Sequence, residues 1–104
     1  EMPRYMVIEA RGVDLLPQLY RELIIKARDL AGVDWDSKGC YAVPIFIHTN
    51  RLVIKVPTPC ITWFRSAMLS IDYAVTVRVT GTARKAKAQA LSIPPIFNLN
   101  EEGF

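Results

Sequence analysis

The sequence is poor in the residues on which small disulfide-rich and zinc-binding domains depend. Its 104 residues include two cysteines and one histidine. A secreted domain held together by disulfides normally has more cysteines, and a structural zinc site needs about four nitrogen, sulfur or oxygen ligands. Cys40 and Cys60 form no C-x-x-C pair. We therefore expect two buried thiols in a reducing cytoplasm.

Long apolar runs and glycine-rich phosphate motifs are also missing. No apolar stretch reaches the roughly 18 residues that a membrane-spanning helix requires, so we expect no membrane partner. No G-x-G-x-x-G or P-loop motif occurs, which argues against a nucleotide-dependent enzyme. His48 and Cys60 belong to no recognisable nucleophile–base arrangement, so a small enzyme using either residue is the least favoured hypothesis.

The composition is that of one globular domain. Apolar residues make up 51% of the chain and charged residues 22%, which are ordinary values for a folded protein. A chain of this length can bury one real core. We expect a single domain over residues 1–104, with an irregular tail over 92–104 that contains Pro94 and Pro95.

The charges are unevenly distributed along the chain. The net charge of +3 combines −2 over residues 1–36 with +5 over residues 37–104. Asp72 is the only acidic residue between Ser37 and Asn100. The second part of the chain is therefore the better candidate for contact with an anionic partner.

Hydrophobic spacing predicts the order β-α-β-β-α-β, followed by a last helix. The expected strands cover residues 4–10, 41–48, 51–56 and 73–80, and the expected helices cover 14–31, 58–71 and 82–91. Asp14, Thr58 and Thr82 are the expected N-caps. Strict alternation in the last strand predicts that Tyr73, Val75, Val77 and Val79 point inward and Ala74, Thr76, Arg78 and Thr80 outward.

This order predicts an α/β (α+β) sandwich of the ferredoxin-like or RRM-like type, with a four-stranded antiparallel sheet and two helices on one face. The second strand lies at an edge in this topology. Pro44 lies on that strand, where its missing N–H group is tolerated. Thr49 and Asn50 are expected to form the turn of a hairpin.

Two groups of residues in the second part could bind phosphate. Arg51, Lys55, Thr76 and Arg78 are expected on the sheet face opposite the two helices, although the last helix could cover that face. The sequence VTGTARK places a glycine turn at Gly81 and a cap at Thr82 before a helix that carries Arg84, Lys85 and Lys87. The plainer interpretation of this second group is a solvated helix with a good cap, and the uncompensated charge slightly favours phosphate.

Three segments carry a resemblance to a known family. They are Arg4 to Glu9 (RYMVIE), the strand Leu52 to Val56 with the following helical run Arg65 to Leu69 (RSAML), and the stretch from Val75 to Lys87 that contains VRVTGTARKAK. In order and spacing, the chain resembles the ribonuclease P protein component 2 family over most of residues 4–90.

The resemblance implies an RRM-like, non-catalytic RNA-binding subunit of ribonuclease P. Such a subunit assists the catalytic RNA in removing the 5′ leader from precursor tRNA. The implied partners are ribonuclease P RNA, precursor tRNA and a second ribonuclease P protein subunit, with room for a homodimer within a heterotetramer. The implied location is the cytoplasm. The protein would hold no cofactor or metal, and Mg²⁺ would accompany the catalytic RNA. The expected RNA-binding residues are Arg78, Gly81, Thr82, Arg84, Lys85 and Lys87, together with Arg51 and Lys55.

A second hypothesis comes from the fold alone. Ferredoxin-like domains also serve as small-ligand sensors or protein-assembly modules that bind no RNA. Such a module would show a ligand pocket or an exposed apolar patch, and no salt-dependent binding of RNA.

Overall fold

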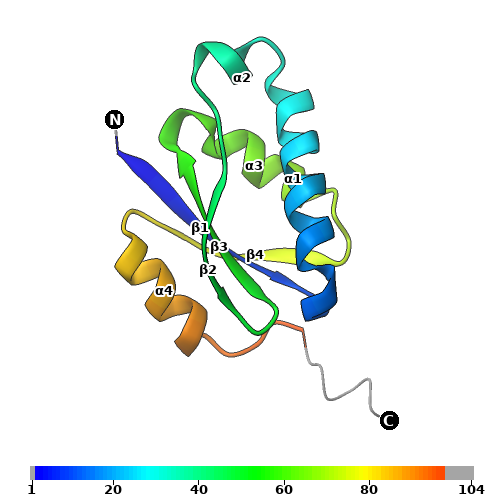
Figure 1. Cartoon of the computed structure of the whole chain (residues 1–104), viewed down its shortest axis with the longest axis vertical. Coiled ribbons are helices and arrows are strands. Elements are labelled where there is room, and N and C mark those ends of the chain that lie inside the picture. Colours follow the sequence, from blue (N-terminus) through cyan, green and yellow to red (C-terminus); the bar gives the residue numbers. More distant parts are fainter. Residues whose placement is uncertain (1, 98–104) are drawn as a thin grey trace.

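The computed structural model describes residues 2–97, and it confirms the predicted order of strands and helices (Figure 1). The elements are β1 (Pro3–Ala10), η1 (Val13–Leu15), α1 (Leu16–Ala31), α2 (Asp34–Ser37), β2 (Val43–His48), β3 (Arg51–Pro57), η2 (Thr58–Cys60), α3 (Ile61–Met68), β4 (Ala74–Thr80) and α4 (Ala83–Ser92). The short helix α2 lies between the helix predicted over 14–31 and the strand predicted over 41–48, where no element was predicted.

The four strands form one antiparallel sheet in the order β2-β3-β1-β4. This is the order expected for a ferredoxin-like sandwich. α1 and α3 pack side by side on one face, where Met6 and Ile8 of β1 are fully buried with the apolar stripes of both helices. The opposite face buries Val7 and Val53 under Ala86 and Ala90 of α4. The sheet is thus covered on both faces, which explains why residues 6–10 of β1 are all buried.

The β2–β3 hairpin lies at one edge of the sheet, as Pro44 predicted. Thr49 and Asn50 form its turn, and Thr49 has a positive φ of 51°. The side chain of Asn50 is buried and donates a hydrogen bond of 2.6 Å to the carbonyl oxygen of Ala10 in β1. The turn is therefore tied to the neighbouring strand.

The predicted alternation of β4 is wrong along part of the strand. Val79 lies opposite Met6 and packs in the α1/α3 core, as predicted. A bulge shifts the register between the partners of Val7 and Ile8, so Thr76 lies opposite Ile8 on the α1/α3 face and Val77 packs under α4. The extra residue of a bulge reverses the faces of the residues that precede it. Buried Ala74, expected to point outward, and half-buried Tyr73 both belong to the α1/α3 core.

The three predicted N-caps have different outcomes. The Thr82 hydroxyl accepts a hydrogen bond of 3.2 Å from the N–H group of Lys85, so the cap of α4 is confirmed. Asp14 lies inside η1, and α1 begins at Leu16 without a side-chain cap. Thr58 donates its hydroxyl hydrogen bond to the carbonyl oxygen of Met2. The helix expected over 58–71 is shorter in the structure, because residues 58–60 form η2 and α3 ends at Met68.

The expectation of two free thiols is wrong. Cys40 and Cys60 form a disulfide, with their Cα atoms 5.8 Å apart and 20 residues apart in sequence. The bond joins the segment before β2 to the start of α3. Close by, the rings of Trp35 in α2 and Phe64 in α3 have centroids 5.9 Å apart. The connection from α1 to β2 is thus held against α3 by a covalent bond and an aromatic contact.

Tyr73 should make the stability of this fold depend on alkaline pH. Burial, together with a hydrogen bond of 2.7 Å to the Glu22 carboxylate, raises the pKa of Tyr73 from 10.0 to about 12. The folded chain therefore keeps a proton that the unfolded chain releases, and this contribution to stability is present below pH 10 and lost as the pH rises to about 12. Urea titrations across this range should show a smaller loss of stability for Tyr73→Phe than for the wild type.

Candidate functional site

The connection between β4 and α4 is the best-formed candidate binding element. Gly81 separates the last strand from the helix, and Thr82 is extended, with φ −134° and ψ 147°, before the first helical turn. The first N–H groups of an α-helix have no partner within the helix. The Thr82 hydroxyl accepts the hydrogen bond of the Lys85 N–H group. The other N–H groups of the first turn leave a partial positive charge at the N-terminal end of α4, where binding of an anion is favourable.

The basic side chains of α4 face away from the sheet. Ala86 and Ala90 are buried, whereas Arg84, Lys85 and Lys87 are exposed. Helical periodicity separates the two sets, because alanines four residues apart form one stripe. In residues 2–97 the ion pairs are Glu22–Lys26 and Glu9–Arg51, so no acidic group within this range neutralises the α4 cluster.

The sheet brings Lys55 and Arg78 to the same face as this element. Lys55 and Thr80 both lie opposite Tyr5, so the three residues form one row across β3, β1 and β4. Arg78 lies in the next row, opposite Val7, and is exposed. Thr80 leads directly into Gly81, so this row ends at the start of α4. Seven of the eight predicted residues therefore lie on β4, on the β4–α4 connection, on α4 or in the row beside them.

Arg51 is the exception, because it is buried. Its exposed fraction is 4%, and its Nε donates a hydrogen bond of 2.8 Å to the fully buried Glu9 carboxylate. Its terminal nitrogens donate to the carbonyl oxygens of Ala90 (3.1 Å), Ile93 (2.5 Å) and Pro94 (2.7 Å). The structure thus places Arg51 under the C-terminal end of α4 and not on a surface that RNA could contact.

Glu9 completes this network and was not among the predicted site residues. Its carboxylate accepts hydrogen bonds from the N–H groups of Ile96 (2.9 Å) and Phe97 (2.7 Å). The Arg11 guanidinium lies 4.6 Å from the centre of the Phe97 ring. The signal available in the sequence was an acidic residue within the apolar run over residues 6–10. Its partner depends on the register of β1 and β3, which places Arg51 opposite Glu9.

The two remaining candidates for catalytic chemistry are Cys60 and His48. Cys60 is buried and bonded to Cys40, so it offers no thiolate in this state. His48 is half-buried in a hollow beside the hairpin turn, with Arg51, Ala90 and Ile93 among its other walls. In the described part of the chain, no three His, Cys, Asp or Glu side chains gather as a metal site.

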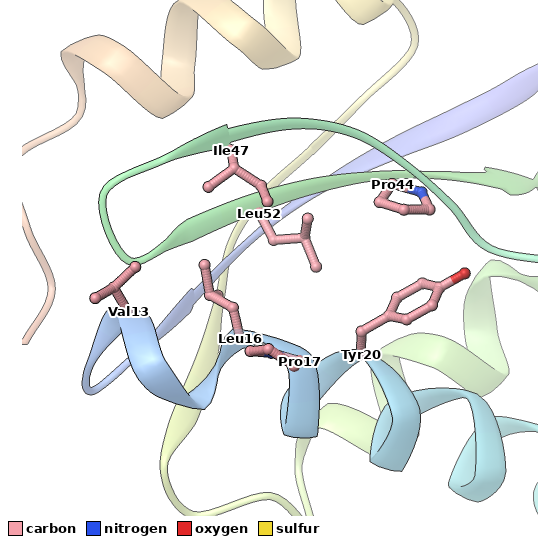
Figure 2. A pocket seen from close by; sticks show the side chains of 7 residues that line it. All are labelled: Val13, Leu16, Pro17, Tyr20, Pro44, Ile47 and Leu52. Atoms are coloured by element: carbon pink, nitrogen blue, oxygen red, sulfur yellow. The ribbon is translucent and has the colours of Figure 1, made fainter.

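A second hollow is apolar throughout. It lies between the start of α1 and the edge strand β2, and its volume is about 320 Å³ (Figure 2). The side chains that line it are Val13, Leu16, Pro17, Tyr20, Pro44, Ile47 and Leu52. We call this hollow the α1/β2 groove. An exposed apolar groove is typical of a site that binds a protein or a small apolar ligand.

Comparison with known proteins adds no relative to these observations. No protein-family model matches the chain, and no curated protein matches it. Within residues 2–97, no helix has the length and apolar character needed to cross a membrane.

Proposed function

We propose that this chain is an RNA-binding protein subunit of ribonuclease P, which assists the catalytic RNA in removing the 5′ leader from precursor tRNA. The observation that carries the proposal is the exposed basic surface at the start of α4. Arg84, Lys85 and Lys87 extend into solvent there, and Lys55 and Arg78 lie on the same side of the sheet. The family resemblance of the β4–α4 segment supports the RNA of ribonuclease P as the ligand, in preference to other RNAs.

This surface is suited to bind the phosphate groups of RNA. Arginine and lysine side chains and helix N-termini bind phosphate oxygens without reading base sequence. The protein would thus position RNA, while bond cleavage belongs to the catalytic RNA and its Mg²⁺. The same proposal includes binding to a second ribonuclease P protein subunit, and it allows two copies of this chain to form a homodimer in the assembled particle.

The first test removes two basic side chains from α4. The double variant Arg84→Ala/Lys85→Ala should bind ribonuclease P RNA more weakly, and the slope of log K against log salt should fall by about 1 for each phosphate that the variant no longer binds. Fluorescence anisotropy over a series of salt concentrations measures both quantities. Arg65→Ala is the matched control, because Arg65 is an exposed basic residue on α3, across the sheet from α4.

Unchanged affinity, unchanged salt slope and unchanged processing of precursor tRNA in the reconstituted particle would rule out this surface. An equal loss of affinity in Arg65→Ala would indicate a general charge effect instead of a defined site. Both variants replace exposed side chains, so their folding should be close to that of the wild type.

The proposal also implies a cytoplasmic location, which gives the disulfide a diagnostic value. Cytosolic proteins usually keep their thiols reduced, and proteins of hyperthermophiles are a known exception. Alkylation of free thiols in freshly lysed cells would report whether Cys40 and Cys60 are joined where the protein works.

The runner-up is a ferredoxin-like assembly or ligand-sensing module that binds no RNA. The α1/β2 groove favours it, because the groove is apolar and open. The two hypotheses differ in the salt dependence of RNA binding, which an assembly module would lack.

A further inference from the structure

The α1–β2 connection (residues 32–42) makes most of its hydrogen bonds within itself. Figure 1 shows its short helix α2 at one end of the molecule, away from the sheet. The five backbone hydrogen bonds that begin in residues 35–40 end on carbonyl oxygens of residues 32–36. Gly32 and Gly39, with φ angles of 59° and 64°, lie on either side of α2. Because glycine adopts such angles and many others at little cost, the connection can move as a unit about these two residues.

The contacts that hold the connection to the rest of the chain are the disulfide, one aromatic contact and one hydrogen bond. The half-buried ring of Trp35 packs against Phe64 of α3. The Tyr20 hydroxyl of α1 donates a hydrogen bond of 2.6 Å to the carbonyl oxygen of Ala42. Residues 36–39 are all exposed. Once the disulfide is broken, these two weaker contacts alone oppose the conformational entropy of the segment, and a segment with few buried contacts opens first.

The sulfur of Cys40 is the more accessible end of the disulfide, because Cys40 is half-buried and Cys60 is fully buried. A thiolate of a small dithiol attacks Sγ of Cys40 and forms a mixed disulfide, and Cys60 leaves as a thiolate that takes up a proton. The second thiol of the reagent then attacks its own sulfur in the mixed disulfide, which releases Cys40 as a thiol. Two electrons and two protons thus pass to the two cysteines, and the dithiol becomes a disulfide.

We propose that the Cys40–Cys60 disulfide is a redox switch that controls a local opening of the α1–β2 connection. In the oxidised chain, the disulfide and the Trp35 ring hold the connection against α3. Reduction by a dithiol releases residues 33–41, while the sheet and the packing of α1 on α3 persist, because most of that core comes from other elements. The proposal does not rest on RNA binding, since α4 packs on the opposite face of the sheet.

Backbone dynamics of the full chain, measured by NMR, test the switch. When dithiothreitol is added, the order parameters of the N–H groups in residues 33–41 should fall from about 0.85 to below about 0.6. The order parameters in β1, β3 and α1 should stay unchanged. Trypsin should cleave after exposed Lys38 about tenfold faster than in the oxidised chain, because cleavage follows the population of the open form. Oxidised glutathione, added after dithiothreitol is removed, should reverse both changes.

Two variants complete the test. Cys40→Ser should show the flexible connection both with and without dithiothreitol. Val33→Ala changes a residue of the same connection that is 89% exposed, so this control should respond to dithiothreitol as the wild type does. Order parameters of residues 33–41 that stay high in the fully reduced wild type would overturn the proposal, because the disulfide would then be a structural cross-link only. Loss of order throughout the reduced wild type would also overturn it, because reduction would then unfold the whole domain.

Discussion

Replacing Glu9 with alanine should lower the free energy of unfolding by about 3–5 kcal/mol. The variant leaves the Arg51 guanidinium, 4% exposed, without its only carboxylate partner in residues 2–97. It also removes the acceptor of the Ile96 and Phe97 N–H groups. A buried charge without a counter-charge is costly because it is removed from water, and the carbonyl acceptors that Arg51 keeps carry no net charge to balance it. Urea denaturation followed by circular dichroism measures the loss.

An exposed ion pair is the matched control for this prediction. Glu22 and Lys26 lie 3.8 Å apart at i,i+4 on α1, with about a third of each side chain exposed. Lys26→Ala should therefore cost less than about 1 kcal/mol. Because one remaining charge is worse than none, Glu9→Met/Arg51→Met should be more stable than Glu9→Ala. A loss in Glu9→Ala no larger than that in Lys26→Ala would show that the buried pair does not hold the C-terminal segment to the sheet.

Breaking the disulfide should have the second large effect. Cys40 and Cys60 close a loop with a sequence separation of 20 residues. A cross-link of that span restricts the unfolded chain and is worth about 3 kcal/mol in the chain-entropy account. Cys40→Ser should lose this amount, and adding a reductant to the wild type should lower its stability to a similar level. Calorimetry with and without reductant measures both effects.

The response to reductant separates this effect from a packing defect. Stability of Cys40→Ser should not change when a reductant is added, because no cross-link remains to be broken. A wild type that is equally stable with and without reductant, or that shows two reactive thiols when native, would contradict the prediction. In that event Cys40 and Cys60 would be the free thiols that the composition first indicated.

Local patterns predicted most of the fold because they reflect the geometry of single elements. The apolar stripe of α1 contains Leu16, Leu19 and Leu23, which are buried as its period required. Pro44 placed β2 at an edge because proline lacks the N–H group that an inner strand needs. Thr82 predicted the start of α4 because a hydroxyl there caps the first turn. The basic candidates on α4 followed from the same element.

The features that were missed depend on contacts between distant segments. Arg51 was expected on an accessible face, since its strand alternates correctly, but α4 and the residues after it cover that position. The bulge in β4 is a property of its pairing with β1, and no residue of β4 alone indicates it. The α1/β2 groove likewise exists only because two segments meet.

The sequence alone was sufficient for the order of the elements, the edge position of β2 and the uneven distribution of charge. Each of these follows from a period of two or 3.6 residues, from a cap or from a count of charges. Tertiary structure was needed to join Glu9 with Arg51 across 42 residues and Cys40 with Cys60 across 20. Whether two such residues meet depends on how the chain folds back, and this through-space information is absent from any local pattern.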